Sequence, residues 1–325
     1  MPIDVAQPVG AYAKKENVAA GVAWMLLTGL LFVGVTGIVR HLGSDLPAAE
    51  GAFIRYAIGL VMISPALIGA FRRRIPGKVW ALYAGRGMVH GFGVMLWFFA
   101  MARIPVAEVT ALGYTSPLFV TLGAAMFLGE KLRARRVVAI LIGLCGVLLI
   151  LRPGFQDIGP GQLAQLGAAP LFAASFIFAK LLTNDAPPGE IVAMLSVGCT
   201  ALLLPFAIAE WRDPTWEELF WLTMTAACAT AGHYTLTKAY QCAPITVTQP
   251  ITFLQIVWAT ILGVVMFGEP ADAWIMAGAA VIVASAWYIA RRELQVKRAD
   301  PPAAITPGGG SGAVEMGATP DRRAP

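Results

Sequence analysis

A stripe of chemically active side chains lies on one face of a long apolar segment. Arg86, His90, Gly93 and Trp97 follow one another at i, i+4, i+7 and i+11, which is the spacing of a single helix face. A guanidinium can bind a carboxylate or phosphate, an imidazole titrates near neutral pH, and an indole can stack on a planar or cationic solute. The stripe predicts a ligand site, although helix packing through interhelical hydrogen bonds would explain the same residues.

A second group of polar side chains lies in other apolar segments, where uncharged donors suit an organic solute better than a bare ion. Its members are Tyr114, His233, Tyr234, Thr252 and Gln255. Prolines at positions 117 and 250 should interrupt two of these segments and free backbone carbonyls, which favours a place on a cavity or at a hinge. The first and sixth segments could complete the wall with Thr28, Phe32, Phe172, Ser175 and Phe176.

Arg55 is a further ionisable residue inside an apolar segment. Gly51 and Gly59 lie four residues before and after it, so small residues line its face of the helix. Such a face suits a cavity wall or a close helix contact. The guanidinium could bind a ligand, or it could bond Glu50 and backbone carbonyls or extend toward the headgroups. A ligand-binding role and an architectural role are equally open for Arg55.

The elements that must position these residues are membrane helices. The chain has 325 residues, 58% hydrophobic and only 13% charged, with a mean hydropathy of +0.69, whereas a soluble domain is about 25% charged. Apolar runs near the roughly 20 residues that cross a bilayer recur from Val18 almost to Arg291. We therefore expect an all-α integral membrane protein. The ten predicted spans are 18–39, 47–70, 79–101, 105–128, 137–151, 161–181, 189–209, 218–240, 244–267 and 273–290.

The chain contains two copies of one unit. Glu269 follows Glu130 by 139 residues, Pro244 follows Pro105 by the same 139 residues, and the intervening alignment needs no gap. Each unit holds five spans, at 18–151 and 161–291, and an odd number of crossings places the second unit upside down in the membrane. The sequence thus predicts two inverted five-helix repeats, an architecture common in transporters with a central site. Duplication for stability alone is the competing explanation.

The distribution of basic residues predicts the orientation, because cytoplasmic loops retain Lys and Arg. A cytoplasmic N-terminus places most of the bases inside and leaves only Arg40, Arg103, Arg152 and Arg212 outside. The acidic connections "EWRDPTWEEL" and "GEPADAW" also fall outside. We expect a cytoplasmic arm at residues 1–17 and a disordered cytoplasmic tail at 292–325, which is rich in Pro and Gly.

These features resemble the EamA family of the drug/metabolite transporter superfamily over about residues 18–291. The resemblance rests on the two-repeat layout, on the fourth and ninth spans that begin at proline and end in Gly-Glu, and on "EGAFIRYAIG" in the second span. It implies a metabolite carrier of the bacterial inner membrane with a central cavity. The superfamily includes amino-acid exporters and importers of vitamins or nucleoside derivatives.

The predicted function is therefore a secondary transporter that works by alternating access on a small organic metabolite such as an amino acid, vitamin or nucleoside derivative. The first alternative is a channel, whose ring of charges or filter loop is absent from the single chain, although oligomerisation could supply one. The second is a membrane-embedded enzyme, for which the sequence has no motif such as HExxH or GxSxG. We expect no cofactor and no nucleic acid. The expected partners are the solute, the bilayer, a proton that His90 or His233 could bind, and a second copy in a homodimer.

Overall fold

Eight of the ten predicted spans recur as helices with small changes at their ends in a computed structural model of the chain, whereas the spans expected at 105–128 and 244–267 are described only in part, as α4 and α11. The structure describes residues 17–43, 45–71, 75–116, 118–119, 134–152, 157–243, 248, 251–252 and 254–299. Within these residues the helices are α1 Val18–Leu42, α2 Ala48–Phe71, α3 Gly77–Met101, α4 Val106–Gly113, α6 Ala134–Leu151, α7 Pro160–Leu182, α8 Pro188–Ala209, α9 Trp216–Cys242, α11 Leu254–Phe267 and α12 Ala273–Ala299. The prolines at 117 and 250 and the far end of the span expected at 105–128 lie outside the described residues.

One predicted boundary is wrong. Helix α12 continues to Ala299, so residues 292–299, which we expected to belong to a disordered tail, are helical. This segment, "RELQVKRA", contains good helix formers, and the first proline comes only at Pro301. The composition that predicts disorder begins after that proline, outside the described residues.

Four helices are long and apolar enough to cross a membrane by length and composition among the described residues, namely α1, α2, α7 and α8. Helices α3 and α9 are at least as long, with 25 and 27 residues. They carry more polar side chains, including Arg86 and His90 in α3 and His233 in α9. Polar side chains within a membrane normally face the bundle interior, so α3 and α9 are the helices on which a site is expected.

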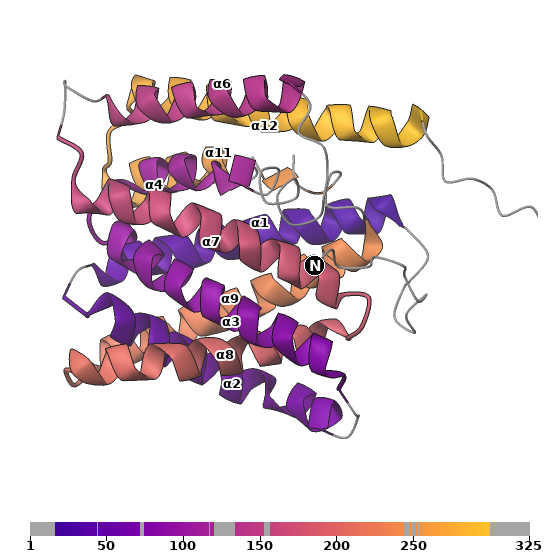
Figure 1. Ribbon diagram of the computed structural model, residues 1–325. Coiled ribbons are helices and arrows are strands. Elements are labelled where there is room, and N and C mark those ends of the chain that lie inside the picture. Colours follow the sequence, from indigo (N-terminus) through magenta and orange to yellow (C-terminus); the bar gives the residue numbers. More distant parts are fainter. Residues whose placement is uncertain are drawn as a thin grey trace, which may run out of the picture.

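The helices form a layered bundle. Helices α6 and α12 pair at one edge, α2 and α8 pair at the opposite edge, and α1, α3, α7 and α9 lie between them (Figure 1). Within this middle layer, α1 packs on α9 and α3 packs on α7, while α4 and α11 pair beside the α6–α12 edge. The same set of pairs results when the first five spans are exchanged with the last five.

Helices α1 and α3 run in the opposite direction to α7 and α9. Arg40 Nη1 donates to the carbonyl of Met101 at 3.1 Å, so α1 and α3 end together. Lys180 Nζ donates to the carbonyl of Tyr240 at 2.7 Å, so α7 and α9 also end together.

The starts of the helices show that these are opposite ends of the bundle. The backbone N–H of Asn17 donates to the carbonyl of Cys242 at 2.9 Å, which places the end of α9 at the start of α1. At the other end of the bundle, a Cβ atom added to Gly161 would lie 2.8 Å from Ile104, because α7 starts where α3 ends.

Glycine permits the closest helix contact that positions α3. A Cβ atom on Gly87 would lie 2.8 Å from the Cα atom of Gly198, so the backbones of α3 and α8 touch there. Without a hydrophobic driving force between helices in lipid, such close packing supplies much of the attraction.

Candidate functional site

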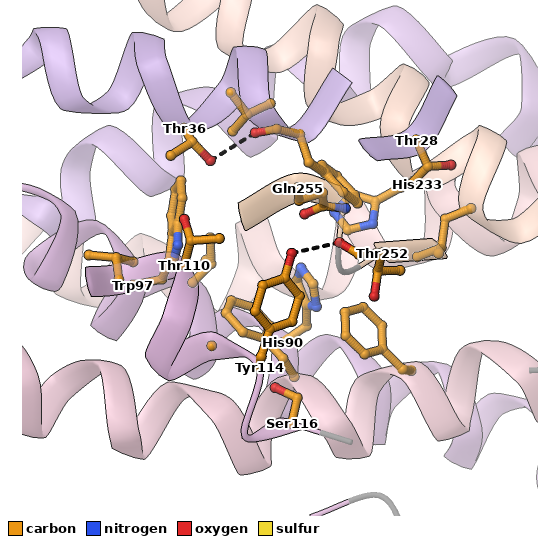
Figure 2. Close-up of a pocket in the computed structure, with 18 of the residues that line it drawn as sticks. Thr28, Thr36, His90, Trp97, Thr110, Tyr114, Ser116, His233, Thr252 and Gln255 are labelled. Atoms are coloured by element: carbon orange, nitrogen blue, oxygen red, sulfur yellow. Dashed lines mark hydrogen bonds between the residues drawn. The ribbon is translucent and has the colours of Figure 1, made fainter. Parts of the chain in front are cut away.

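A cavity of about 210 Å³ lies between the helices of the bundle. Its wall combines side chains from both halves of the chain, on α1, α2, α3, α4, α7, α9 and α11 and on the segment before α11. Figure 2 shows His90, Tyr114, His233 and Gln255 gathered around it, although they come from four different parts of the sequence. The site therefore exists only when the two halves are assembled.

Seven of the nine residues singled out in the sequence line this cavity. They are Arg55, His90, Trp97, Tyr114, His233, Thr252 and Gln255. The other two, Arg86 and Tyr234, are not among the lining residues.

Arg86 is only 1% exposed and faces α8 instead of the cavity. Its Nη1 donates to the carbonyl of Ile191 at 3.0 Å. Although Arg86 and His90 share a helix face, α3 packs against both α7 and α8, and the first turns of that face contact α8. Arg86 therefore joins two helices, although its Nε is buried without a hydrogen-bond partner. The carboxylate or phosphate clamp that the sequence suggested for Arg86 stays a prediction that the lining of this cavity does not support.

Tyr234 points away from the cavity and is 36% exposed. The ammonium of Lys238 lies 5.6 Å from the centre of its ring, on the same helix. Its neighbour His233 turns inward because adjacent residues on a helix point about 100° apart. Tyr234 follows His233 directly in the sequence but lies on a different side of the helix, outside the cavity lining.

Two histidines from different halves meet at the cavity wall. The ring centroids of His90 and His233 lie 5.0 Å apart in an edge-to-face arrangement. Nδ1 of His90 is 2.9 Å from the hydroxyl of Ser175, whereas Nδ1 of His233 is buried without a hydrogen-bond partner. The rings of Phe32 and Phe172 lie 5.2 Å and 5.1 Å from His233 and His90, respectively. This part of the wall is aromatic with a few polar edges.

Another part of the wall lies where α4 ends at Gly113. The Tyr114 hydroxyl donates to the carbonyl of Thr252 at 2.6 Å (Figure 2), and the hydroxyl of Ser116 donates to the carbonyl of Ala169 on α7 at 3.0 Å. Irregular backbone at membrane depth is tolerated where it lines a cavity, and these two hydrogen bonds tie the segment after α4 to its neighbours.

Arg55 brings a charge to this largely uncharged wall. The residue is 4% exposed, and its Nε and Nη1 atoms are buried without hydrogen-bond partners. Its Cζ atom lies 4.1 Å above the ring of Tyr56, and that ring lies 6.2 Å from the ring of His90. The cavity-lining residues that the structure describes include no aspartate or glutamate.

Several lining residues were not singled out in the sequence. They are Thr36, Thr110, Ser116, Gln165 and Tyr240. Gln165 could have been found, because Gln165, Phe172 and Phe176 have the i, i+7, i+11 spacing that drew attention to the stripe on α3. Gln165 is 2% exposed, and its Oε1 has no partner.

A charged contact crosses the bundle just beyond one end of the cavity. Nη2 of Arg40 lies 2.9 Å from Oε1 of Glu269, whose Oε2 accepts the backbone N–H of Val106 at 2.9 Å. Thr36 and Val109, which line the cavity, are about one turn away from Arg40 and Val106. We call Arg40, Glu269 and the Val106 N–H the charged latch. It joins α1, α4 and the segment that follows α11.

A different contact lies near the other end. There the Lys180 ammonium joins α7 to the end of α9 through the Tyr240 carbonyl, one turn beyond Phe176 in the cavity wall. At each end of the cavity, a basic side chain on the first helix of one half therefore donates a hydrogen bond to the last turn of the third helix of the same half.

Comparisons with known proteins agree on the kind of molecule. The description of the EamA-like transporter family matches this sequence twice, at residues 19–152 and 159–291. A riboflavin transporter of Vibrio cholerae is 30% identical over 292 residues, which cover 87% of this chain and 97% of that protein. A riboflavin transporter of Rhizobium johnstonii is 30% identical over 290 residues, covering 87% and 95%.

More distant relatives carry another name. An S-adenosylmethionine uptake transporter of Rickettsia bellii is 24% identical over 274 residues, covering 84% of this chain and 94% of that protein. A solved crystal structure superposes with a TM-score of 0.57 at 22% identity, covering 85% of this chain and 98% of the other. At that identity the structural likeness concerns the fold.

Proposed function

Because the chain belongs to the EamA-like transporter family, we propose that it carries a planar, uncharged heterocyclic metabolite across the bacterial inner membrane, with riboflavin as the first candidate. The observation that carries this proposal is the cavity between the halves, where aromatic rings and uncharged hydrogen-bonding groups surround one arginine. Two relatives that share about a third of their residues with this chain are named riboflavin transporters.

The charge of the wall separates riboflavin from the other candidate solute. S-adenosylmethionine carries a sulfonium, an ammonium and a carboxylate, so its net charge is positive at neutral pH. The described lining residues offer no carboxylate to match it, and Arg55 adds a positive charge of its own. Like charges at short range in a poorly solvated site repel strongly. Riboflavin is neutral and meets no such penalty.

We propose that the two halves are inverted repeats that rock about this cavity. The gapless offset of 139 residues in the sequence, the opposite directions of α1 and α7, and helix pairs that exchange into one another all support the repeat. Inverted repeats commonly operate by alternating access around a site near the bilayer midplane. The charged latch supports a gate at one end, since it must break for the cavity to open there.

The proposed orientation places both termini in the cytoplasm and the charged latch on the outer side. The charge map of the loops supports it, because Lys and Arg concentrate in loops on the other side. The solute would reach the cavity from outside when the latch is open.

Uptake by proteoliposomes tests the function. Vesicles containing the purified protein should accumulate radiolabelled riboflavin in a saturable way, and S-adenosylmethionine should compete poorly. Vesicles preloaded with unlabelled riboflavin should take up the label faster, since a carrier returns more quickly when it is loaded, whereas a channel has no such return step. Equal uptake by protein-free vesicles would overturn the proposed function.

A further inference from the structure

The guanidinium of Arg55 is built into the cavity wall with donors to spare. Nε and Nη1 are buried and make no hydrogen bond, although the side chain is only 4% exposed. Buried polar groups are nearly always paired, and leaving a charged group unpaired costs more than leaving a neutral one. A partner supplied by a bound solute would remove this cost.

No carboxylate in the described part of the chain neutralises Arg55. Glu50, one helix turn and a little more away on α2, accepts the backbone N–H of Arg212 at 3.2 Å, and Glu190 accepts the hydroxyl of Tyr83 at 2.7 Å. The cation–π contact with Tyr56 stabilises the charge but uses the face of the guanidinium and leaves its N–H groups in the plane available. Arg86 is a second buried cation on the neighbouring helix.

The second half of the chain has no equivalent of Arg55. Gly198 lies 139 residues after Gly59, and both glycines are at close helix contacts, on α8 and α2. The same offset pairs Arg55 with Met194, which is buried among apolar side chains. The charge of Arg55 therefore occurs in one half only, and a single charge suits a solute without twofold symmetry.

We propose that Arg55 selects the solute by donating hydrogen bonds to the carbonyl edge of a planar heterocycle, such as the dione ring of a flavin. This inference rests on the proposed function and names the residue that recognises the substrate class. Two adjacent ring carbonyls flanking an N–H concentrate partial negative charge in the plane of the ring. A guanidinium presents several donors in one plane and fits such an edge better than an ammonium does.

The cavity supplies the rest of the recognition that this contact needs. Phe172 and Phe176 stack at 6.4 Å with an interplanar angle of 21°, and both line the cavity with Trp97 and Tyr114. Aromatic side chains of this kind bind the faces of a planar solute. Stacking on the faces of the solute would give affinity for any flat ring. Arg55, at the edge of the solute, would therefore distinguish rings with carbonyl groups from rings without them.

Binding of riboflavin and of lumichrome, which keeps the dione ring and lacks the ribityl chain, tests this assignment on the full-length protein in detergent. Arg55→Lys keeps the charge and loses the planar set of N–H donors. Arg55→Met introduces the residue type of Met194, the equivalent position in the second half. Both variants should bind both ligands about tenfold to a hundredfold more weakly, because a hydrogen bond to a charged group is lost. Arg55→Met should be the weaker binder.

Arg86→Lys is the matched control, since Arg86 is an equally buried arginine that bonds a helix backbone. It should lower the melting temperature and leave the Kd for riboflavin within about twofold. Equal loss of affinity in Arg86→Lys and Arg55→Lys would overturn the assignment, and so would a loss for riboflavin alone, which would place Arg55 on the ribityl chain. Unchanged affinity in Arg55→Met would overturn it as well.

A measurement on the wild-type protein covers the case in which Arg55 variants fail to fold. Phenazine is a flat tricyclic ring without carbonyl groups, and it should bind at least about tenfold more weakly than lumichrome. Equal binding of the two would overturn the role of Arg55 and leave the proposed function standing. Wild-type protein that neither binds nor carries riboflavin would overturn the proposed function itself.

Discussion

Replacing Glu269 with glutamine should open the cavity at the end where the charged latch lies. The substitution keeps the shape of the side chain and one acceptor oxygen, and it removes the negative charge that faces Arg40. Oε1 of Glu269 forms a salt bridge with Nη2 of Arg40 at 2.9 Å, and Oε2 accepts the backbone N–H of Val106 at 2.9 Å. The side chain of Glu269 is 9% exposed, and that of Arg40 is 24% exposed. The contact is thus only partly screened by solvent, and its loss should favour the open state.

The size of the shift follows from the difference between charged and neutral hydrogen bonds. Charged ones contribute about 1.5–3 kcal/mol and neutral ones about 0.5–1.5 kcal/mol, so Glu269→Gln should weaken closure by about 1–2 kcal/mol. Closure and opening are populations in equilibrium, and a change of that size alters their ratio by about five- to thirtyfold. The population of the open state should rise by this factor while it remains the minor one.

Cysteine labelling measures this population directly. Thr36 lines the cavity one turn inside the latch, and Thr36→Cys should react with a membrane-impermeant maleimide faster by the stated factor when Glu269→Gln is added. The chain without Thr36→Cys gives the background from its four own cysteines. Asp272→Asn, the same acid-to-amide change three residues further on and outside the latch, serves as the control. An unchanged labelling rate in a folded Glu269→Gln variant would refute the role of the latch, as would equal acceleration in the control.

Three further outcomes are expected. Reporter fusions near Asp213 should read external and those after α12 cytoplasmic, and a cytoplasmic reading at Asp213 would contradict the inverted repeat. Burial raises the pKa of Asp272, but hydrogen bonds from the N–H groups at the start of α12 and from Arg152 outweigh it and leave this pKa below its usual value. The carboxylate therefore stabilises the fold above its unfolded pKa of about 3.9. The wild-type protein should melt at a higher temperature than Asp272→Asn at neutral pH, and this difference should shrink as pH falls below the unfolded pKa and vanish below the folded pKa. A difference that stays constant down to pH 3 would refute this. Gly87→Ala should destabilise by about 1–3 kcal/mol, because its Cβ atom would lie 2.8 Å from the backbone of α8, whereas Gly77→Ala, with no atom within 4 Å, should be tolerated in the same thermal assay.

The helices could be predicted from the sequence because their signals are local. Apolar length placed eight of the ten spans within a few residues of the observed helices, the exceptions being those expected at 105–128 and 244–267. The error at the end of α12 has the same origin, since a boundary drawn where the apolar run stops ignores the strong helix formers that follow Arg291. An amphipathic or charged extension of a membrane helix needs no apolar side chains to be helical.

The candidate site was predictable only in part, because side-chain direction depends on neighbours that the sequence does not reveal. His90 and Arg86 share a stripe, but α7 covers one end of it and α8 the other. Gln165 fits the same spacing and was not predicted, because an uncharged amide costs less than a charged side chain in a membrane and is a weaker indication of a site. Tyr114 was found because a proline nearby in the sequence predicts the end of a helix, and α4 does end at Gly113.

The two halves share a scaffold and differ in the chemistry of the cavity. One kind of contact occurs at corresponding helix ends in both halves: the side chain of Arg40 donates to the carbonyl of Met101, and that of Lys180 donates to the carbonyl of Tyr240. In the proposed rocking mechanism the two halves would exchange roles, so each of these contacts would serve one of the two openings. Arg55 has no such counterpart. If Arg55 holds the solute as we propose, this contact would persist while the two ends open and close in turn, and access to the site would change without movement of the site.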